Sequence, residues 1–466
     1  MREPAILIGL FTMALPSLVA IAAAVVAPPG AIGWRLDGTG SVGDGDYPTS
    51  WSVTEGVQWK TKTPAWSNAS PIVVGDRIFF CGEPSTLICA NRLDGTILWQ
   101  APLTYLDVVP EAERAAFQEG MTKGEQFQNE LTAVERDLNR ARRELQKNED
   151  EEAKARLTAA VATLDEQVKV AREKLAPFRN HLIPVTQPTN GYSSATPVSD
   201  GTRVYVFYGT GMAAAYDLDG KRLWARVVER PTHGWGNSAS PVLAGNTLVL
   251  HILKVHGLDP ATGETRWVVP STMRWGTPVV TVIGGQDVVV TANGELIRAT
   301  DGTLIAKGLG ALTYCAPVVK DEIAYFIEHG GRAVKLPGTT DPETATVEEL
   351  WKTQPPNERY YASPVVHDGI IYAIMQKSIF STIDAATGAV IYSEDLKLGG
   401  TAYPSITLVG GVLHVSSDSG KTVLVAPGRE YRELGRNELE NFRSTPLFID
   451  GHMYVRGLNH LYSVGK

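Results

Sequence analysis

A short sequence motif that recurs eight times after residue 50 sets the strongest constraint on the fold of this chain. In most copies Ser, Thr or Ala precedes a proline, and two apolar runs separated by a Gly/Asp turn follow. The prolines are Pro71, Pro197, Pro241, Pro278, Pro317, Pro364, Pro404 and Pro446, with gaps of 126, 44, 37, 39, 47, 40 and 42 residues. A period of about 40 residues is typical of four-stranded propeller blades. The sequence therefore predicts repeated β-units.

A second sequence motif follows the first in most copies. An Asp-containing turn ends in Gly, and an aromatic residue stands four positions later. The Asp carboxylate caps the turn, Gly takes the positive-φ position, and the aromatic residue opens the next strand with a large apolar face. We expect this face to pack between neighbouring blades. The clearest copies are Asp94-Gly95 to Trp99, Asp219-Gly220 to Trp224, Asp259 through Gly263 to Trp267, and Asp384 through Gly388 to Tyr392.

The two ends of the repeat region complement each other. The last repeat reaches Lys466 without its aromatic strand, whereas the region begins with an unpaired strand at 56–59. Pairing them would remove an exposed sheet edge. The predicted fold is thus an all-β, eight-bladed β-propeller over residues 34–466, with the N-terminal strand closing the last blade. Seven blades is the alternative, because Ile305 replaces the aromatic of the fourth repeat and only Tyr431 lies near that of the seventh.

The long first gap contains a segment of another kind, at residues 106–180. It carries 16 acidic and 13 basic side chains. Its apolar residues step by 4 and 3, which is the seam of a coiled coil, and 148–150 break the pattern. We predict an antiparallel helical hairpin inserted between the first two blades, serving as an inert decoration or as a handle for a partner. The seam residues are Phe127, Leu131, Val134, Leu138, Ala141 and Leu145, then Leu157, Val161, Leu164, Val168, Ala171 and Leu175.

The beginning of the chain is typical of an exported protein. Residues 5–27 carry no charge and follow Arg2, so residues 1–30 are predicted to be a cleaved signal peptide or a single membrane anchor. The expected location is the periplasm or cell envelope, either free or anchored by this segment. The formal net charge of −8 argues against a nucleic-acid partner.

The repeats resemble those of pyrroloquinoline-quinone (PQQ)-type propellers, whose blades carry Ala-x-Asp-x-x-Thr-Gly-x-x-x-Trp. The best matches are residues 257–267 and 383–388. The opening from Trp34 to Gly40, with Trp51 and Trp59, also looks like the start of exported PQQ-like proteins. The resemblance implies the fold but leaves function open. The superfamily includes calcium- and quinone-dependent dehydrogenases as well as non-enzymatic, BamB-like propellers of outer-membrane assembly.

The catalytic templates that can be read from sequence are missing. The quinone dehydrogenases resemble one another in a vicinal cysteine pair over PQQ, whereas Cys81, Cys89 and Cys315 are all separated. Cys81 and Cys89 share a predicted hairpin, where they are either a pair or two small buried residues. No GxSxG, Walker, HExxH or calcium-loop pattern occurs. We therefore predict no catalytic residues, no metal site and no cofactor, with PQQ and calcium only in the alternative reading.

Aromatic and basic residues precede the predicted innermost strands. Because these segments share one rim of the central channel, they should surround a single opening. Rings beside guanidinium groups suit a sugar, an aryl ring, a carboxylate or a peptide side chain, although varied spacing from the prolines favours packing between blades for some of them. The candidate ligand-binding residues are Trp66, Asn68, Tyr192, His233, Trp235, Arg274, Trp275, Tyr314, Arg359, Tyr360, Tyr361, Tyr403 and Arg443.

The function predicted from sequence is that of an exported, non-enzymatic PQQ-like propeller, acting as a binding or scaffold protein in the cell envelope. An envelope protein is the expected partner, through the hairpin or a propeller face. The alternative is a PQQ- and calcium-dependent dehydrogenase that oxidises alcohols or sugars. A third class, the carbohydrate-active propeller enzymes, requires two carboxylates on the channel rim.

Overall fold

The computed structural model describes residues 32–356 and 358–465. The predicted signal or anchor segment at 1–30 lies outside them. Within the described chain, the strands form eight β-sheets, seven with four strands and one with five. No described helix is long and apolar enough to cross a membrane.

The sheets follow one another along the chain, and each runs from an inner to an outer strand. Sheet 1 contains β3 (Ile72–Val74), β4 (Arg77–Gly82), β5 (Thr86–Asn91) and β6 (Ile97–Pro102). Sheet 2 contains β7 (Val198–Ser199), β8 (Arg203–Phe207), β9 (Met212–Asp217) and β10 (Arg222–Val227). Sheet 3 contains β11 (Val242–Ala244), β12 (Thr247–His251), β13 (Lys254–Leu258) and β14 (Thr265–Pro270). Sheet 4 contains β15 (Val279–Ile283), β16 (Gln286–Val290), β17 (Leu296–Arg298) and β18 (Leu304–Ala306).

The second half repeats this plan. Sheet 5 contains β19 (Val318–Lys320), β20 (Ile323–Ile327), β21 (Gly331–Lys335) and β22 (Glu348–Thr353). Sheet 6 contains β23 (Val365–His367), β24 (Ile370–Ile374), β25 (Ile379–Asp384) and β26 (Val390–Asp395). Sheet 7 contains β27 (Thr407–Val409), β28 (Val412–Ser416), β29 (Lys421–Val425) and β30 (Glu433–Glu438), with β1 (Ser41–Val42) added beside β27. Sheet 8 contains β31 (Leu447–Ile449), β32 (His452–Arg456), β33 (His460–Val464) and β2 (Val57–Lys62).

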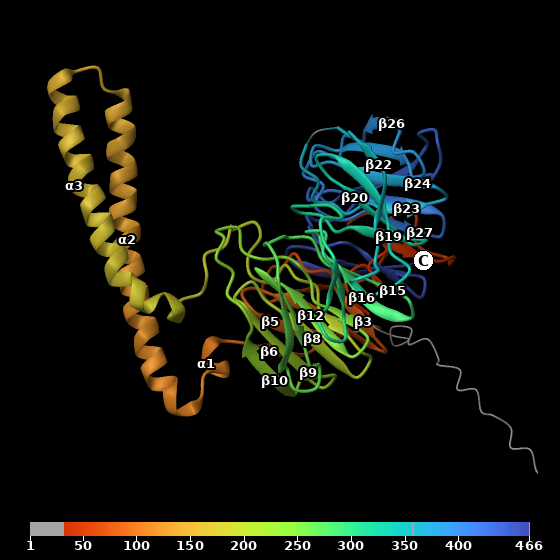
Figure 1. The fold of residues 1–466 in the computed structure, drawn as a ribbon, viewed down its shortest axis with the longest axis horizontal. Helices are drawn as coiled ribbons and strands as arrows, with labels where there is room; N and C mark the ends of the chain where they lie inside the picture. The colour runs from red at the N-terminus through yellow and green to blue at the C-terminus, as the bar shows by residue number, and fades with distance from the viewer. Residues whose placement is uncertain (1–31, 357, 466) are drawn as a thin grey trace, which may run out of the picture.

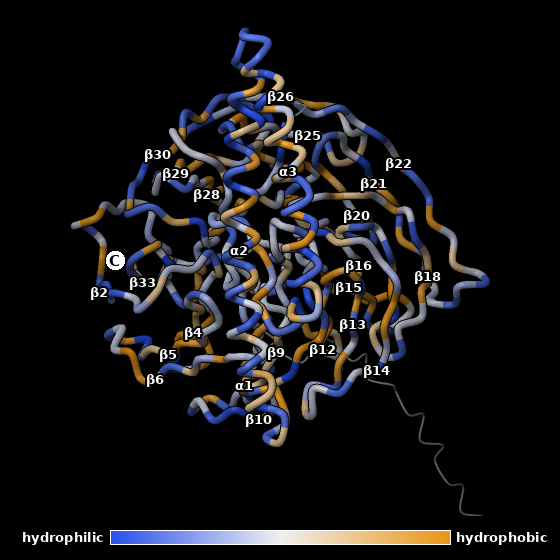
Figure 2. The backbone as a smooth tube through the Cα atoms, turned by 90° about the vertical axis from the view of Figure 1, so that its left-hand side faces the viewer, coloured by the Kyte–Doolittle hydropathy of each residue, from blue (hydrophilic) through white to orange (hydrophobic). Residues whose placement is uncertain are grey.

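The arrangement of the sheets is consistent with a β-propeller. In Figure 2 the outer strands β26, β22, β18, β14, β10, β6, β2 and β30 succeed one another around the molecule. Middle strands such as β24 are buried along their whole length, whereas outer strands such as β6 alternate between exposed and half-buried residues. This difference follows from position, because a middle strand has neighbouring sheets on both faces.

The predicted pairing of the N-terminal strand is present. β2 runs antiparallel to β33, with Trp59 opposite Ser463. The rings of Trp59 and Tyr454 lie 6.1 Å apart between centroids. A hydrophobic cluster also joins sheet 8 to sheet 1, through Tyr454 and Phe80 among others. The two ends of the repeat region are therefore in contact.

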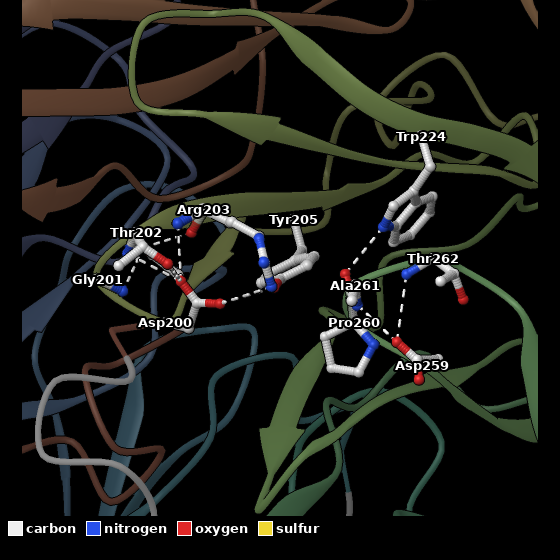
Figure 3. Close-up of polar contacts among 11 residues, drawn as sticks. Asp200, Gly201, Thr202, Arg203, Tyr205, Trp224, Asp259, Pro260, Ala261 and Thr262 are labelled. Carbon is white, nitrogen blue, oxygen red and sulfur yellow. Dashed lines mark hydrogen bonds and ion pairs between the residues drawn. The ribbon is translucent and has the colours of Figure 1, made fainter.

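The motif of an Asp/Gly turn followed by an aromatic residue provides a recurring contact between consecutive sheets. The Trp224 indole donates a hydrogen bond of 2.9 Å to the Pro260 carbonyl, in a turn whose amides are held by the Asp259 carboxylate (Figure 3). Gly263 has φ of 75°, and a Cβ there would meet the Trp224 ring. The expected packing between blades is thus confirmed at this turn. Equivalent bonds run from Trp59 to Arg92, Trp99 to Leu218, Trp267 to Ala299, and Trp351 to Ala385.

The predicted helical hairpin projects from the sheets (Figure 1). It begins with α1 (Tyr105–Val108) and the 3-10 turn η1 (Glu111–Glu113), continues through α2 (Arg114–Lys147) and α3 (Glu151–Leu175), and ends in η2 (Ala176–His181). The polar break at 148–150 separates the two long helices as expected. Their contact face contains the predicted seam, with Leu131, Leu138, Val168, Ala171 and Leu175 buried.

Both helices extend beyond the span of the predicted apolar seam. α2 has 34 residues and α3 has 25, so α2 extends roughly 50 Å at 1.5 Å per residue. Arg142 pairs with Asp165 across the hairpin, and Arg172 pairs with Glu135. At the base, the guanidinium of Arg230 lies 4.2 Å from the ring centroid of Tyr105, which fixes the hairpin on sheet 2.

The three cysteines are free and buried. Cys81 lies opposite Leu87 and Cys89 lies opposite Phe79, so β4 and β5 do not place the two thiols as a pair. Burial raises the pKa of each of these thiols to about 12. The structure confirms the interpretation of Cys81 and Cys89 as two small buried residues.

We predict that His414 makes the fold sensitive to acid. Its ring is buried between Trp51 and Phe448, and burial lowers its pKa from 6.5 to about 4. The folded state therefore holds the neutral ring while the unfolded state takes up a proton. Stability from this group is present above pH 6.5 and is lost as the pH falls toward 4.

Urea unfolding at several pH values checks this expectation. Between pH 7 and pH 4, wild type should lose about 3 kcal/mol relative to His414→Phe, since each pKa unit corresponds to about 1.4 kcal/mol. Above pH 7 the difference between the two proteins should be constant. Parallel stability curves down to pH 4 would show that the ring is not held neutral.

Candidate functional site

A cavity of about 240 Å³ lies where the inner strands of all eight sheets begin. Sites for drug-sized ligands are commonly about 300–1,000 Å³, so this one suits a small ligand. Its lining combines hydroxyl, amide and aromatic side chains. The lining residues are Trp34, Asn68, Ser70, Gln187, Thr189, Asn190, Ser194, Thr196, Trp235, Ser238, Ser240, Trp275, Gly276, Thr277, Tyr314, Ala316, Tyr361, Ser363, Tyr403, Ser405, Arg443 and Thr445.

One residue from each sheet forms a ring around the cavity, which we call the hydroxyl ring. Its members are Ser70, Thr196, Ser240, Thr277, Ala316, Ser363, Ser405 and Thr445. The backbone N–H of one member donates to the side-chain hydroxyl of the next. Six such bonds of 2.9–3.1 Å link Ser70 to Thr196, Thr196 to Ser240, Ser240 to Thr277, Ala316 to Ser363, Ser363 to Ser405, and Ser405 to Thr445. Ala316 has no hydroxyl to offer Thr277.

The hydroxyl ring corrects the alignment of the seventh repeat. The sequence places Pro404 as the repeat proline, which would make Tyr403 the ring residue. In the structure Ser405 occupies the ring, and Ile406 stands where the other sheets have proline. Using the proline alone therefore places the ring residue of this sheet two positions too early in the sequence.

Five aromatic side chains form one wall of the cavity, which we call the aromatic wall. Trp275 lies 5.7 Å from Tyr314, Tyr314 lies 4.9 Å from Tyr361, and Tyr361 lies 4.8 Å from Tyr403, all between ring centroids. Trp235 packs against Trp275 and Tyr314. The Trp275 indole donates to the Gly236 carbonyl, which fixes the orientation of its ring.

The opposite wall is polar and comes mainly from the segment that follows the hairpin. Asn68 Nδ2 donates to the Thr189 and Asn190 carbonyls and to the Ser194 hydroxyl, at 2.8–3.0 Å. These three acceptors fix the orientation of the amide. Asn68 Oδ1 is buried and has no hydrogen-bond partner among the described residues. It is an unused acceptor in the lining of the cavity.

Buried and half-buried carboxylates hold the loops that bear the rim residues. Glu83 accepts from the backbone N–H groups of Tyr192 and Ser193, and Glu328 accepts from those of Thr313 and Tyr314. Burial raises the pKa of both Glu83 and Glu328, and the amide bonds oppose this shift. Asp418 binds the Thr401 N–H in the same way, below Tyr403. These acids position the rim but do not line the cavity.

The N-terminal segment closes the far end of the cavity. Trp34 contributes to the lining, and Arg35 Nη2 donates to the carbonyls of Pro364 and Ile406, which are equivalent positions in sheets 6 and 7. Burial lowers the pKa of Arg35 to about 9. Gly40 has φ of 74° and lies so close to the guanidinium that a Cβ would overlap it. The cavity therefore has a floor.

The structure brings seven of the thirteen predicted rim residues together. Asn68, Trp235, Trp275, Tyr314, Tyr361, Tyr403 and Arg443 line the cavity. Ligand contact remains a prediction for all of them. Two further residues stand next to the wall without lining it: His233 lies against Trp275, and Arg359 lies over Trp235.

Four predicted rim residues have other environments. Trp66 lies beneath Gly191, and Tyr192 directs its hydroxyl to the Pro184 carbonyl. Arg274 is bound to Asn293. Tyr360 is buried in a hydrophobic cluster with its hydroxyl on the Pro356 carbonyl, because adjacent residues of the segment point to opposite sides and Tyr361 faces the cavity.

The hydroxyl ring, Trp34 and four polar residues of the segment after the hairpin were not predicted as site residues. These four are Gln187, Thr189, Asn190 and Ser194. For the ring, a signal was present in the small residue before each repeat proline. The polar wall has no periodic signal, because it is a single loop that follows the insertion.

The donor set of the cavity does not fit PQQ with calcium. No described lining residue is Asp, Glu, His or Cys. No group of three or more such side chains among the described residues has a geometry that could hold a metal. Calcium in proteins takes six to eight oxygen ligands, with carboxylates prominent among them. The lining offers only hydroxyl and amide oxygens.

Comparisons with known proteins agree with the fold and the repeats. A family model described as outer membrane protein assembly factor BamB matches residues 183–391. A BamB of Moranella endobia (strain PCIT) is 21% identical over 261 residues, covering 50% of this chain and 64% of that protein. The match thus spans less than two thirds of the relative. The predicted resemblance to PQQ-like, BamB-like propellers is confirmed.

Solved structures share the fold at low sequence identity. BamB from Moraxella catarrhalis superposes with a TM-score of 0.53 at 9% identity, over 87% of this chain and 98% of that one. A europium-containing methanol dehydrogenase gives 0.53 at 11% identity, over 92% and 90%. These structures show the fold alone, because their identity to this chain is low and both a BamB and a methanol dehydrogenase are among them.

We predict that the hydroxyl ring contributes measurably to stability. Ser405→Ala leaves the buried N–H of Ser363 without its acceptor, which should lower the free energy of unfolding by about 1–3 kcal/mol. Ala316→Ser is the matched control, since it adds a hydroxyl at the one ring position that lacks it, and it should leave stability unchanged or higher. Chemical denaturation measures both. Equal stability of Ser405→Ala and wild type would mean that these bonds do not hold the sheets together.

Proposed function

We propose that the eight sheets are the eight blades of one ring, and that the protein is a non-enzymatic binding and scaffold propeller of the cell envelope. The matching relative is named an outer membrane protein assembly factor, which supports an envelope location and a protein partner for this chain. In this proposal the cavity binds a small ligand and the hairpin contacts a protein.

The lining of the cavity carries this proposal. Hydroxyl, amide and aromatic groups suit binding, whereas the Ser, Thr and Tyr hydroxyls of the described lining have no His, Asp, Glu, Lys or Cys beside them in that lining to activate a nucleophile or hold a metal. The acids that hold the rim, Glu83, Glu328 and Asp418, already accept from backbone N–H groups. A site of this composition holds a ligand without a group to transform it.

The hairpin supports the scaffold part of the proposal. Figure 1 shows it standing away from the sheets, and Figure 2 shows it in front of one face of the ring. Its distal surface is densely charged with both signs, including the ion pairs Arg156–Glu152 and Lys154–Glu151. The base is fixed by packing of α1 on sheet 2, so the distal part is a projecting arm rather than part of the core.

Reconstitution distinguishes the binding protein from the dehydrogenase. We expect the purified protein, incubated with PQQ and Ca²⁺, to reduce no redox dye when alcohols or aldose sugars are added, because the cavity lacks the ligands for the metal. A heat-denatured sample with the same additions is the control. Dye reduction above that control, dependent on both PQQ and Ca²⁺, would establish the enzyme instead.

Shortening the hairpin tests the scaffold. Residues 131–173 are replaced by a short turn, which leaves the base contacts of Tyr105 and Arg230 intact. The melting temperature of the propeller should stay within about 2 °C of wild type, since the removed residues lie outside the sheets. Photo-crosslinks from a benzoylphenylalanine at Glu111, near the base, to an envelope protein should disappear. Unchanged crosslinks would assign partner binding to another surface.

A further inference from the structure

We infer that the cavity binds a pyranose sugar bearing a carboxylate, of which a hexuronic acid is the simplest example. This inference rests on the proposed function, because it takes the cavity as a binding site and names its ligand. Three features of the cavity carry it: the hydroxyl ring with Asn68, the aromatic wall, and Arg443.

The hydrogen-bonding groups of the cavity call for a ligand with several hydroxyl groups. Six ring hydroxyls, among them Thr196, Ser240 and Ser363, each accept one N–H bond, and none of the six donates its own proton to a described residue. Asn68 Oδ1 has the opposite need, because it is a buried acceptor without a donor. Only groups that both donate and accept satisfy the two sides together, and sugar hydroxyls do so.

The aromatic wall supplies the apolar contact that a sugar ring needs. A pyranose has one face formed mainly by C–H groups, and it packs on the face of Trp or Tyr while its hydroxyls point sideways. Trp275, Tyr314 and Tyr361 pack in series with their ring planes tilted by 35° and 58°, and the Asn68 amide belongs to the polar part of the same lining. A ligand between them contacts rings on one face and polar groups at its edge.

Arg443 gives the preference for an acid. Its Nη1 donates to the Thr189 carbonyl, its Nε lies 3.8 Å from Asp418, and Nη2 has no hydrogen-bond partner among the described residues. It is the only charged side chain in the described lining. A carboxylate at the ligand edge would therefore meet a guanidinium and no acidic lining residue.

Two other ligand classes leave part of this chemistry unused. An aromatic carboxylate fits the wall and Arg443, but it has no donor for Asn68 Oδ1 and few acceptors for the ring hydroxyls. A neutral sugar satisfies those groups but offers no anionic acceptor to Arg443 Nη2, because Asp418 approaches the guanidinium at Nε. The acidic sugar is the class that satisfies all three features.

Isothermal titration calorimetry on the purified whole protein tests the inference. The probes are D-galacturonic and D-glucuronic acid, the neutral sugars galactose and glucose, and benzoate. At least one uronic acid should bind about tenfold or more tightly than its neutral parent, and benzoate should bind more weakly than that acid. Binding of benzoate alone, or of none of the sugars, would overturn the inference.

Three variants separate the contributions. Arg443→Gln should abolish the preference for the acid while binding of the neutral sugar is retained, and this retained binding reports an intact cavity. Tyr314→Leu should weaken acid and neutral sugar alike. Arg429→Gln is the matched control, because Arg429 pairs with Asp384 outside the lining, and it should bind as wild type does. An Arg443→Gln protein that still prefers the acid would contradict the role of this guanidinium.

The outcomes also separate this inference from the proposed function. If no sugar binds while hairpin crosslinks form and no dye is reduced, the ligand assignment fails and the scaffold function stands. If a uronic acid binds and is oxidised with PQQ and Ca²⁺ present, the ligand assignment stands and the non-enzymatic function fails.

Discussion

The hydrogen bond from the start of one inner strand to a hydroxyl of the next sheet is the contact on which the rest of the structure depends. An inner strand has a partner within its own sheet on one side only, so its other edge faces the channel with unpaired backbone groups. A buried N–H without an acceptor costs about as much as a lost hydrogen bond. Ser or Thr at a single position, as in Ser363 and Ser405, supplies that acceptor and sets the spacing between sheets. The indole bonds, such as Trp224 to Pro260, do the same at the outside.

The same hydroxyls determine the chemistry of the cavity. Six of them use a lone pair to bind the neighbouring sheet and donate to no described residue, so structural support and the proposed ligand recognition come from the same atoms. Ala316 is informative here, because the ring tolerates one missing hydroxyl between sheets 4 and 5. In sheets 4 to 6 the hydrophobic packing is one continuous cluster, which compensates for the missing bond. The polarity of the hydroxyl ring thus cannot be changed without changing how the sheets are joined.

The sequence predicted the features that repeat and missed those that occur once. The period of the prolines predicted the repeated sheets. The turn Gly and the aromatic residue after it predicted the packing between consecutive sheets at their outer edge. The 4-3 spacing of apolar residues predicted the hairpin, and each of these features depends on a local pattern. Ser405 was missed because its repeat has Ile406 in place of proline, and Tyr360 was assigned to the rim because one residue decides which side a segment faces. Asn190 and the rest of the polar wall follow no period. Their position depends on contacts such as Asn68, which are distant in sequence.

The floor of the cavity decides from which side a ligand enters. Arg35 and Leu36 both have positive φ, a conformation that Gly usually adopts, and Arg35 is buried with its Nη2 on two equivalent carbonyls of sheets 6 and 7. Such strain persists only where surrounding contacts fix it, here the parallel pairing of β1 with β27 and the close approach of Gly40. With that end closed, entry is from the rim, where the segment after the hairpin forms the polar wall. A ligand in the cavity and a protein held by the hairpin would therefore lie on the same side of the propeller, with the segment after the hairpin beside both.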